Sequence, residues 1–248
     1  SHVKVAMFLI HYLCLTTILL HGIIASEIQK LIGDAHGFRP HVHKYLVMLH
    51  ISYTGQVDQF FCSGSIIDKK WIISAAHCFR DNVIKIKIKK IMGSRNLVLG
   101  FGRKIYNHPD YIHVRTFNFY NGENDLALVK TAKPIQFNAF TQPIGLARLR
   151  SFGQQGIIAG YGGYRNLIRP LEGTVVVNRC GYGSKMLCSE CFAYTESGDS
   201  GGALMTDDGL VGVISAGSFP VSKGSVFVDL SIHFNWIQKK YLKIISHM

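Results

Sequence analysis

Three segments far apart in the chain each carry a residue type that acyl-transfer chemistry requires. His77 lies in WIISAAHCF, Asp125 in NDLALVK, and Ser200 between the glycines of SGDSGG. A serine hydroxyl is a weak nucleophile and needs an adjacent base. A histidine can be that base when a carboxylate fixes its tautomer and stabilises the imidazolium. Each segment alone is a weak signal, but the three together, in the order His, Asp, Ser, strongly indicate nucleophilic serine chemistry.

The segments between these residues have the pattern of β-strands. Short stretches of alternating apolar residues, bounded by turn residues, recur along the chain; examples are VIKIKIKKI, TVVVN and SVFVDL. Only the C-terminal stretch IHFNWIQKKYLKII, residues 232–245, has helical periodicity. The 248 residues, 48% hydrophobic and 17% charged, suit one large or two small all-β units with a sizeable core. The sequence therefore predicts an all-β fold with a C-terminal α-helix.

The first residues have the pattern of a targeting segment. Lys4 precedes a long apolar run, and the small residues Ala25 and Ser26 follow it. This pattern predicts a secretory signal peptide over residues 1–26 and a secreted, extracellular protein that is not attached to a membrane after cleavage. The alternative is a membrane anchor, because the run is about long enough to span a bilayer.

The cysteines that remain after signal cleavage are odd in number. They are Cys62, Cys78, Cys180, Cys188 and Cys191. Secretion permits disulfides, so one thiol is expected to be free or intermolecular. No cysteine and histidine spacing indicates a closed zinc site. His41 and His43 could bind a metal ion as a pair, but we interpret them as surface histidines. We expect no metal site and no cofactor.

A basic run follows His77. KIKIKK, residues 85–90, alternates lysine with isoleucine, and the whole chain has a formal net charge of +12. As a strand, the run points its lysines outward and its isoleucines inward. One interpretation is a solvated face. The other is a surface for a polyanion such as a glycosaminoglycan, bound through Lys85, Lys87, Lys89 and Lys90. Nucleic acid is not an expected partner.

From about Leu31 to its C-terminus, the chain resembles the chymotrypsin family of serine proteases. The matching motifs are SAAHC, NDLALVK, GDSGG, KIYNHPDY, AGYG and NWI. The resemblance implies two packed six-stranded antiparallel barrels, divided here near residues 134–143, with the site in the cleft between them. It implies that His77 is general base and acid, that Asp125 orients it, and that Ser200 is the nucleophile. The N–H groups of Gly198 and Ser200 would form the oxyanion hole.

The resemblance also implies disulfides. FCSGS resembles the family's FCGGS, so Cys62 would pair with Cys78. Cys180 would pair with Cys188 or Cys191, and the motif MLC favours Cys188. The family's calcium loop is acidic, whereas the corresponding region here is rich in lysine, so calcium is not expected.

Activation has a counterpart in the sequence. Family zymogens are cut after a basic residue, and the new N-terminal ammonium pairs with the aspartate before the nucleophile. Here EIQK precedes LIGD. Residues 27–30 would be a short activation propeptide, and residues 31–248 the protease domain. Lys30 would be the cut site and Leu31 the partner of Asp199. Two residues depart from the family pattern, because Leu31 replaces Ile and Asp34 replaces Gly.

Further departures gather where the primary substrate pocket would lie. Tyr194 occupies the position of the pocket floor, Glu196 replaces a disulfide cysteine, and Ser225 replaces a glycine that keeps the pocket open. The family's Ser-Trp-Gly strand is Ser-Ala-Gly here. The predicted pocket residues are Tyr194, Thr195, Ser215, Gly217 and Ser225. One interpretation is a pocket plugged by the tyrosine ring, and the other is that this ring points elsewhere.

These departures predict a secreted protease homologue with complete catalytic groups and a blocked pocket. It resembles the inactivated serine-protease paralogues of parasitic mites, which are related to the mite group 3 allergens, although most of those have lost catalytic residues. That resemblance implies secretion towards the host and interference with host defence proteins such as complement, with little or no proteolysis. We expect the protein to be a monomer. The alternative is an active endopeptidase of unusual specificity, whose partners are peptide substrates. Polyanion binding is compatible with both.

Overall fold

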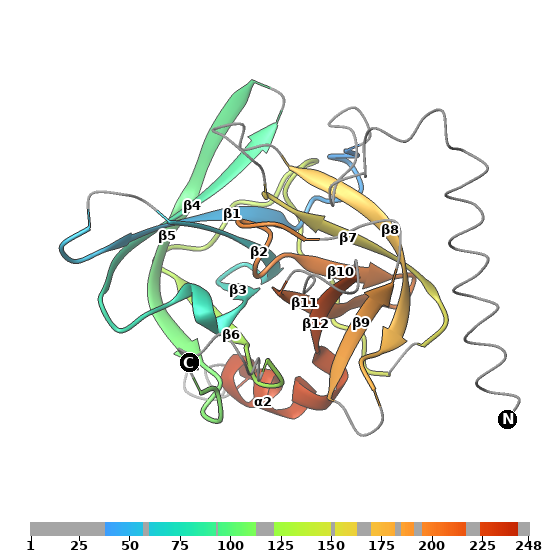
Figure 1. Cartoon of the computed structure of the whole chain (residues 1–248). Helices are drawn as coiled ribbons and strands as arrows, with labels where there is room; N and C mark the ends of the chain where they lie inside the picture. The colour runs from blue at the N-terminus through green and yellow to red at the C-terminus, as the bar shows by residue number, and fades with distance from the viewer. Residues whose placement is uncertain are drawn as a thin grey trace, which may run out of the picture.

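Two closed antiparallel barrels of six strands each, followed by a C-terminal α-helix, form most of the described part of the chain (Figure 1). The computed structural model describes residues 38–56, 60–92, 94–112, 122–149, 152–162, 170–181, 185–190, 195–216 and 224–242. The segment 132–154 connects the barrels, and the division predicted near residues 134–143 falls within it. The predicted all-β class with two six-stranded barrels and a C-terminal helix is confirmed.

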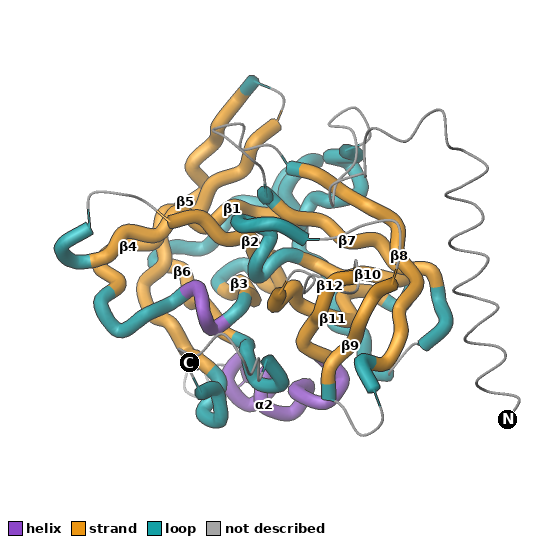
Figure 2. The backbone as a smooth tube through the Cα atoms, in the orientation of Figure 1, coloured by secondary structure: helices purple, strands orange, loops and turns teal. Residues whose placement is uncertain are grey.

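The first barrel has the strand order β1-β2-β3-β6-β5-β4, and the second has the order β10-β11-β12-β9-β8-β7. The strands of the first barrel are β1 Leu46–Tyr53, β2 Phe60–Asp68, β3 Trp71–Ser74, β4 Val83–Met92, β5 Arg95–Asn107 and β6 Ala127–Thr131. Those of the second are β7 Gln155–Gly160, β8 Leu171–Arg179, β9 Met186–Glu190, β10 Ala203–Thr206, β11 Gly209–Ala216 and β12 Gly224–Asp229. Figure 2 shows the one-turn helix η1, Ala76–Cys78, and the C-terminal helix α2, Leu230–Leu242, in purple.

Strand β4 shows how the alternating pattern builds the first barrel. Ile86 and Ile88 are buried, whereas Lys85 is exposed, as a period of two requires. Lys90 departs from the prediction because its side chain is buried. Its ammonium group donates to the carbonyl oxygens of His43, Lys44 and Leu46 at 3.1, 3.0 and 2.9 Å. Burial lowers the pKa of Lys90 to about 8. Lys90 is therefore a structural residue and no part of a basic surface.

A polar network joins the segment before β1 to the second barrel. Arg39 donates to Glu172 of β8 through both its backbone N–H, at 2.8 Å, and its Nε, at 2.7 Å. His43 lies between Glu172 and Tyr45, 2.9 Å from each. His43 is fully buried, so its interpretation as a surface histidine was wrong; His41 is exposed. Burial is the main cause that lowers the pKa of His43 to about 4, which keeps the ring neutral.

Helix α2 begins at Leu230, two residues before the predicted start. Asp229 caps it, because its carboxylate accepts from the N–H of Ser231 at 2.9 Å and from the hydroxyl of the same residue at 2.6 Å. The buried side chains Leu230, His233 and Ile237 face the protein, and the helix packs against β11. Within the described residues, no helix has the length and apolar character needed to cross a bilayer.

Candidate active site

His77 and Asp125 meet at the end of the first barrel. His77 lies in η1, directly after β3, and Asp125 lies two residues before β6, the strand that pairs with β3. The Nδ1 of His77 is 2.7 Å from Oδ2 of Asp125, and the backbone N–H of His77 donates to Oδ1 at 2.8 Å. Ser215 of β11 donates its hydroxyl to the same Oδ2, so the second barrel also holds this carboxylate.

These contacts set the charges of the pair. Burial alone would raise the pKa of Asp125, but the charge of His77 and the hydrogen bonds from His77 and Ser215 lower it below its usual value. Burial alone would lower the pKa of His77, but the charge and hydrogen bond of Asp125 together raise it. An ionised Asp125 only accepts hydrogen bonds, so Nδ1 of His77 carries the proton. Nε2 is then the ring nitrogen that can accept one.

Ser200 lies in the turn that leads into β10. Its carbonyl oxygen accepts from the backbone N–H of Ser63 at 2.7 Å, which places Ser200 beside β2 of the first barrel. In the part of the chain that the structure describes, the Ser200 hydroxyl makes no hydrogen bond to His77; such contacts are often long in free enzymes. The N–H groups of Gly198 and Ser200 also have no partner among the described residues. Gly198 has a φ of +98°, a conformation that favours glycine.

Asp199 points away from this turn into the protein. Its carboxylate accepts from the N–H of Gly162 at 2.7 Å and from that of Glu196 at 3.0 Å. A Cβ at Gly160 or Gly162 would collide with this carboxylate, so both glycines are needed for its close approach. No cation pairs with Asp199 within the described ranges, and burial raises its pKa to about 7. Lys30 and Leu31 lie outside the described residues.

A row of hydroxyls lies where the substrate pocket was predicted. The N–H of Thr195 donates to the hydroxyl oxygen of Ser225 at 3.0 Å, and the N–H of Ser225 donates to the hydroxyl oxygen of Ser189 at 3.1 Å. All three residues are buried, and Ser225 is only 1% exposed. The serine at the position of the resembled family's glycine is therefore buried and hydrogen-bonded to the backbone of Thr195. Tyr194 and Gly217 lie outside the described residues, so the interpretation of a plugging tyrosine stays a prediction.

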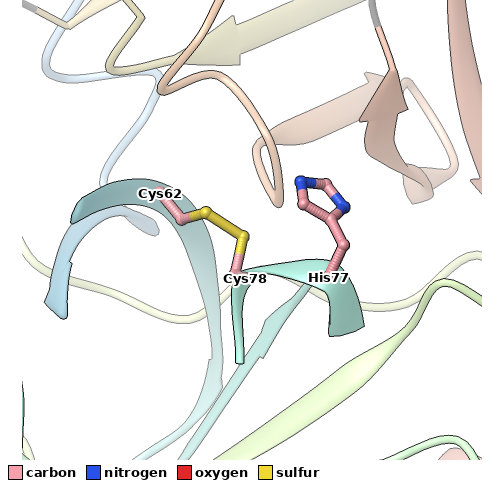
Figure 3. A group of neighbouring side chains, drawn as sticks. All are labelled: Cys62, His77 and Cys78. Carbon is pink, nitrogen blue, oxygen red and sulfur yellow. A yellow bond between two sulfur atoms is a disulfide. The ribbon is translucent and has the colours of Figure 1, made fainter. Parts of the chain in front are cut away.

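Among the described residues two disulfides are present, Cys62–Cys78 and Cys180–Cys188, and they are the pairs favoured from the resemblance. Figure 3 shows the first of them beside the imidazole of His77. The two sulfur atoms and a ring nitrogen of His77 lie within 4.8 Å of one another, a spacing that could hold a metal ion. However, the sulfurs are bonded to each other and are not thiolates, which are the form that binds metals. Cys191 lies outside the described residues.

Sequence reasoning missed Ser63, whose fully buried hydroxyl also contacts the Ser200 turn. It donates to the carbonyl oxygen of Gly198 at 2.8 Å and accepts from the N–H of Tyr161 at 2.8 Å. A signal was present, since FCSGS differs from the resembled FCGGS at this residue alone. Its meaning depends on two segments about a hundred residues away, whose proximity the sequence does not show.

The two barrels and the residues that they bring together define the trypsin-like serine protease fold. The family model for trypsin matches residues 32–237, and the chain belongs to this family. Trypsin from Xenopus laevis is 29% identical over 90% of this chain and 96% of its own, and rat cationic trypsin-3 is 29% identical over 79% and 83%. Neuropsin, a serine protease expressed in mouse brain, superposes with a TM-score of 0.66 over 82% of this chain and 97% of its own. At 22% identity, that likeness shows the fold alone. Trypsin-like proteases act on peptide or protein substrates.

Proposed function

We propose that this chain is a secreted trypsin homologue with complete catalytic groups and an obstructed primary pocket. Its turnover of peptides would be absent or very weak, and it would act by binding proteins. The observation that carries this proposal is Ser225, whose hydroxyl accepts from Thr195 inside the predicted pocket wall. The sequence adds Tyr194 at the pocket floor and replaces the pocket's disulfide cysteine by Glu196. Side chains that enter the pocket at these positions would leave a substrate side chain little area to bury.

The catalytic groups themselves support retained chemistry. His77 Nε2 would take the proton of the Ser200 hydroxyl as it attacks an acyl carbon, and Asp125 would stabilise the imidazolium that forms. The N–H groups of Gly198 and Ser200 would receive the developing oxyanion, for which one such donor can contribute about 3 kcal/mol. The geometry of His77, Asp125 and Ser215 is the observation that favours the alternative, an active endopeptidase of unusual specificity.

Activation would follow cleavage after Lys30. The ammonium group of Leu31 would then supply the cation that the buried Asp199 carboxylate lacks within the described residues. The resemblance to mite paralogues adds host defence proteins, complement among them, as candidate partners. We propose that the protein acts outside the cell as a monomer, after removal of residues 1–26.

One experiment separates the two functions. The chain cut after Lys30 is treated with a small fluorophosphonate probe and, separately, with a broad library of peptides. Labelling of Ser200 with little peptide cleavage supports the proposed function, and Ser225→Gly combined with Tyr194→Gly should then increase cleavage. Efficient cleavage by the parent protein would establish the endopeptidase instead. Absence of labelling in both proteins would show that the catalytic groups are not functional.

A second surface, on the opposite side of β4 from the barrel core, supports polyanion binding. Lys85 is exposed and Lys87 and Lys89 are half-buried. Burial is the main cause that lowers the pKa of the neighbouring His50 to about 4, and the charges of these three lysines lower it further. We propose that sulfated polysaccharides bind along these lysines. Replacing Lys87 and Lys89 by Gln should shorten retention on heparin and reduce its salt dependence, whereas replacing Lys239 and Lys240 of α2 by Gln should have a smaller effect. If both double variants shortened retention equally, the net charge of the protein alone would explain its retention on heparin.

A further inference from the structure

Ser63 lies in β2 of the first barrel, but its hydroxyl and its backbone N–H form hydrogen bonds with residues of the second half of the chain. Its hydroxyl donates to the carbonyl oxygen of Gly198 and accepts from the N–H of Tyr161, each at 2.8 Å. Its backbone N–H donates to the carbonyl oxygen of Ser200 at 2.7 Å. One residue of the first barrel therefore holds the catalytic turn on both sides of Asp199.

The position of Ser63 is itself fixed. Its carbonyl oxygen accepts from the hydroxyl of Ser74 on β3 at 2.8 Å. The chain at Gly201 runs so close that a Cβ there would collide with this hydroxyl and this carbonyl. Since Ser63 and Ser74 are both fully buried, the Ser63 hydroxyl has few other conformations available.

The turn also has a second anchor, which works differently. The Asp199 carboxylate holds the N–H groups of Gly162 and Glu196, but it is buried and has no cation partner in the described ranges. Ionising this buried carboxylate without a cation partner costs free energy, so the anchor depends on the charge state of Asp199. The Ser63 anchor uses a neutral hydroxyl, so it does not depend on a new N-terminus.

We propose that the Ser63 hydroxyl is a positioning residue that keeps the turn of Gly198 to Ser200 in place in the uncleaved chain. The catalytic turn of the proenzyme is then already ordered before Leu31 becomes available. The catalytic use of this turn, in which Gly198 and Ser200 serve as oxyanion donors, rests on the proposed function. The positioning itself can be measured without any activity.

The test uses the chain with Lys30→Gln, which prevents cleavage. In this background, hydrogen exchange is followed by mass spectrometry in peptides that cover residues 196–203, where Asp199, Gly201 and Gly202 donate backbone hydrogen bonds. Ser63→Ala should speed exchange of these amides roughly tenfold, the effect of about one to two lost hydrogen bonds. Ser63→Gly, which restores the resembled family's residue, should do the same and guards against misfolding of the alanine variant.

Ser65 provides a matched control. It lies on the same strand and is equally buried, but its hydroxyl has no hydrogen-bond partner among the residues that the structure describes. Ser65→Ala should leave exchange in residues 196–203 unchanged. In all variants, exchange in β1 should also stay unchanged, because a general loss of stability would accelerate it everywhere.

Fluorophosphonate labelling of Ser200 connects the inference to function. Ser63→Ala should slow labelling of the uncleaved chain by roughly tenfold, from the same lost hydrogen bonds, and slow the cleaved chain less, because Asp199 then has its cation. Unchanged exchange in both Ser63 variants would overturn the inference, whatever the labelling shows. Faster exchange in proteins that never react with the probe would uphold the inference and reject the proposed catalytic groups.

Discussion

The buried carboxylate of Asp199 should make the stability of the uncleaved chain depend on pH in an unusual direction. Its pKa is raised from 3.8 to about 7 by burial. The folded protein therefore binds a proton between these values that the unfolded chain releases. A group with a raised folded pKa contributes stability that is fully present below the unfolded pKa and is lost as pH rises through the folded pKa. At about 1.4 kcal/mol per pKa unit, the loss is roughly 4 kcal/mol.

The measurement compares the Lys30→Gln chain with the same chain carrying Asp199→Asn. Free energies of unfolding are determined with denaturant at several values between about pH 3 and pH 8. The free energy of unfolding of the parent minus that of the variant should fall by roughly 4 kcal/mol as the pH rises across this range. Taking the difference removes the contributions of other groups, among them His43, whose lowered pKa acts in the opposite direction.

Two further proteins sharpen this test. Asp207→Asn removes an exposed carboxylate in the turn between β10 and β11 and is the control for the loss of one negative charge. The chain cut after Lys30 should lose the dependence, because the ammonium of Leu31 would favour the ionised carboxylate. A parent-minus-variant difference for Asp199 that stays flat in the uncleaved chain would refute the reasoning.

Three other predictions follow from single contacts. Ser215→Ala removes a donor to Asp125 and should slow probe labelling of the nucleophile by roughly fivefold, about 1 kcal/mol; an unchanged rate would mean that this hydroxyl is dispensable. Lys90→Met removes the three hydrogen bonds from the ammonium group to main-chain carbonyl oxygens and should lower the free energy of unfolding by about 2–3 kcal/mol. The exposed Lys85→Met should change it by less than about 0.5 kcal/mol. Gly162→Ala places a Cβ against a buried carboxylate and should lower the melting temperature, and an unchanged value would show that the neighbouring chain can move aside.

The barrels could be predicted because their signal is local and repeated. In a strand such as β4, the alternating positions of Ile86 and Ile88 indicate which face is buried. Antiparallel neighbouring strands also need only short connections. The residues of the site could be proposed for another reason. Nucleophile chemistry demands particular residue types, and His77, Asp125 and Ser200 stand in motifs that few other functions need.

The buried polar residues could not be predicted, because their partners are distant in sequence. A strict period of two does place Lys90 on the same face as Ile86 and Ile88, but burial of an ammonium group is tolerable only with compensating acceptors. Those acceptors belong to residues 43–46, whose proximity follows from the folded barrel. His43 is similar, since one of the two partners of its buried imidazole is Glu172 of the second barrel, which is distant in sequence.

The two hydrogen bonds from Arg39 to Glu172 also limit what can happen after cleavage. Leu31 lies eight positions before Arg39 in the sequence, so a new N-terminus could lie at most roughly 28 Å from this fixed point. A short tether of this kind gives an amine an effective concentration on the order of millimolar near its target. Pairing with Asp199 would then be a first-order step, with a rate that does not change when the protein is diluted.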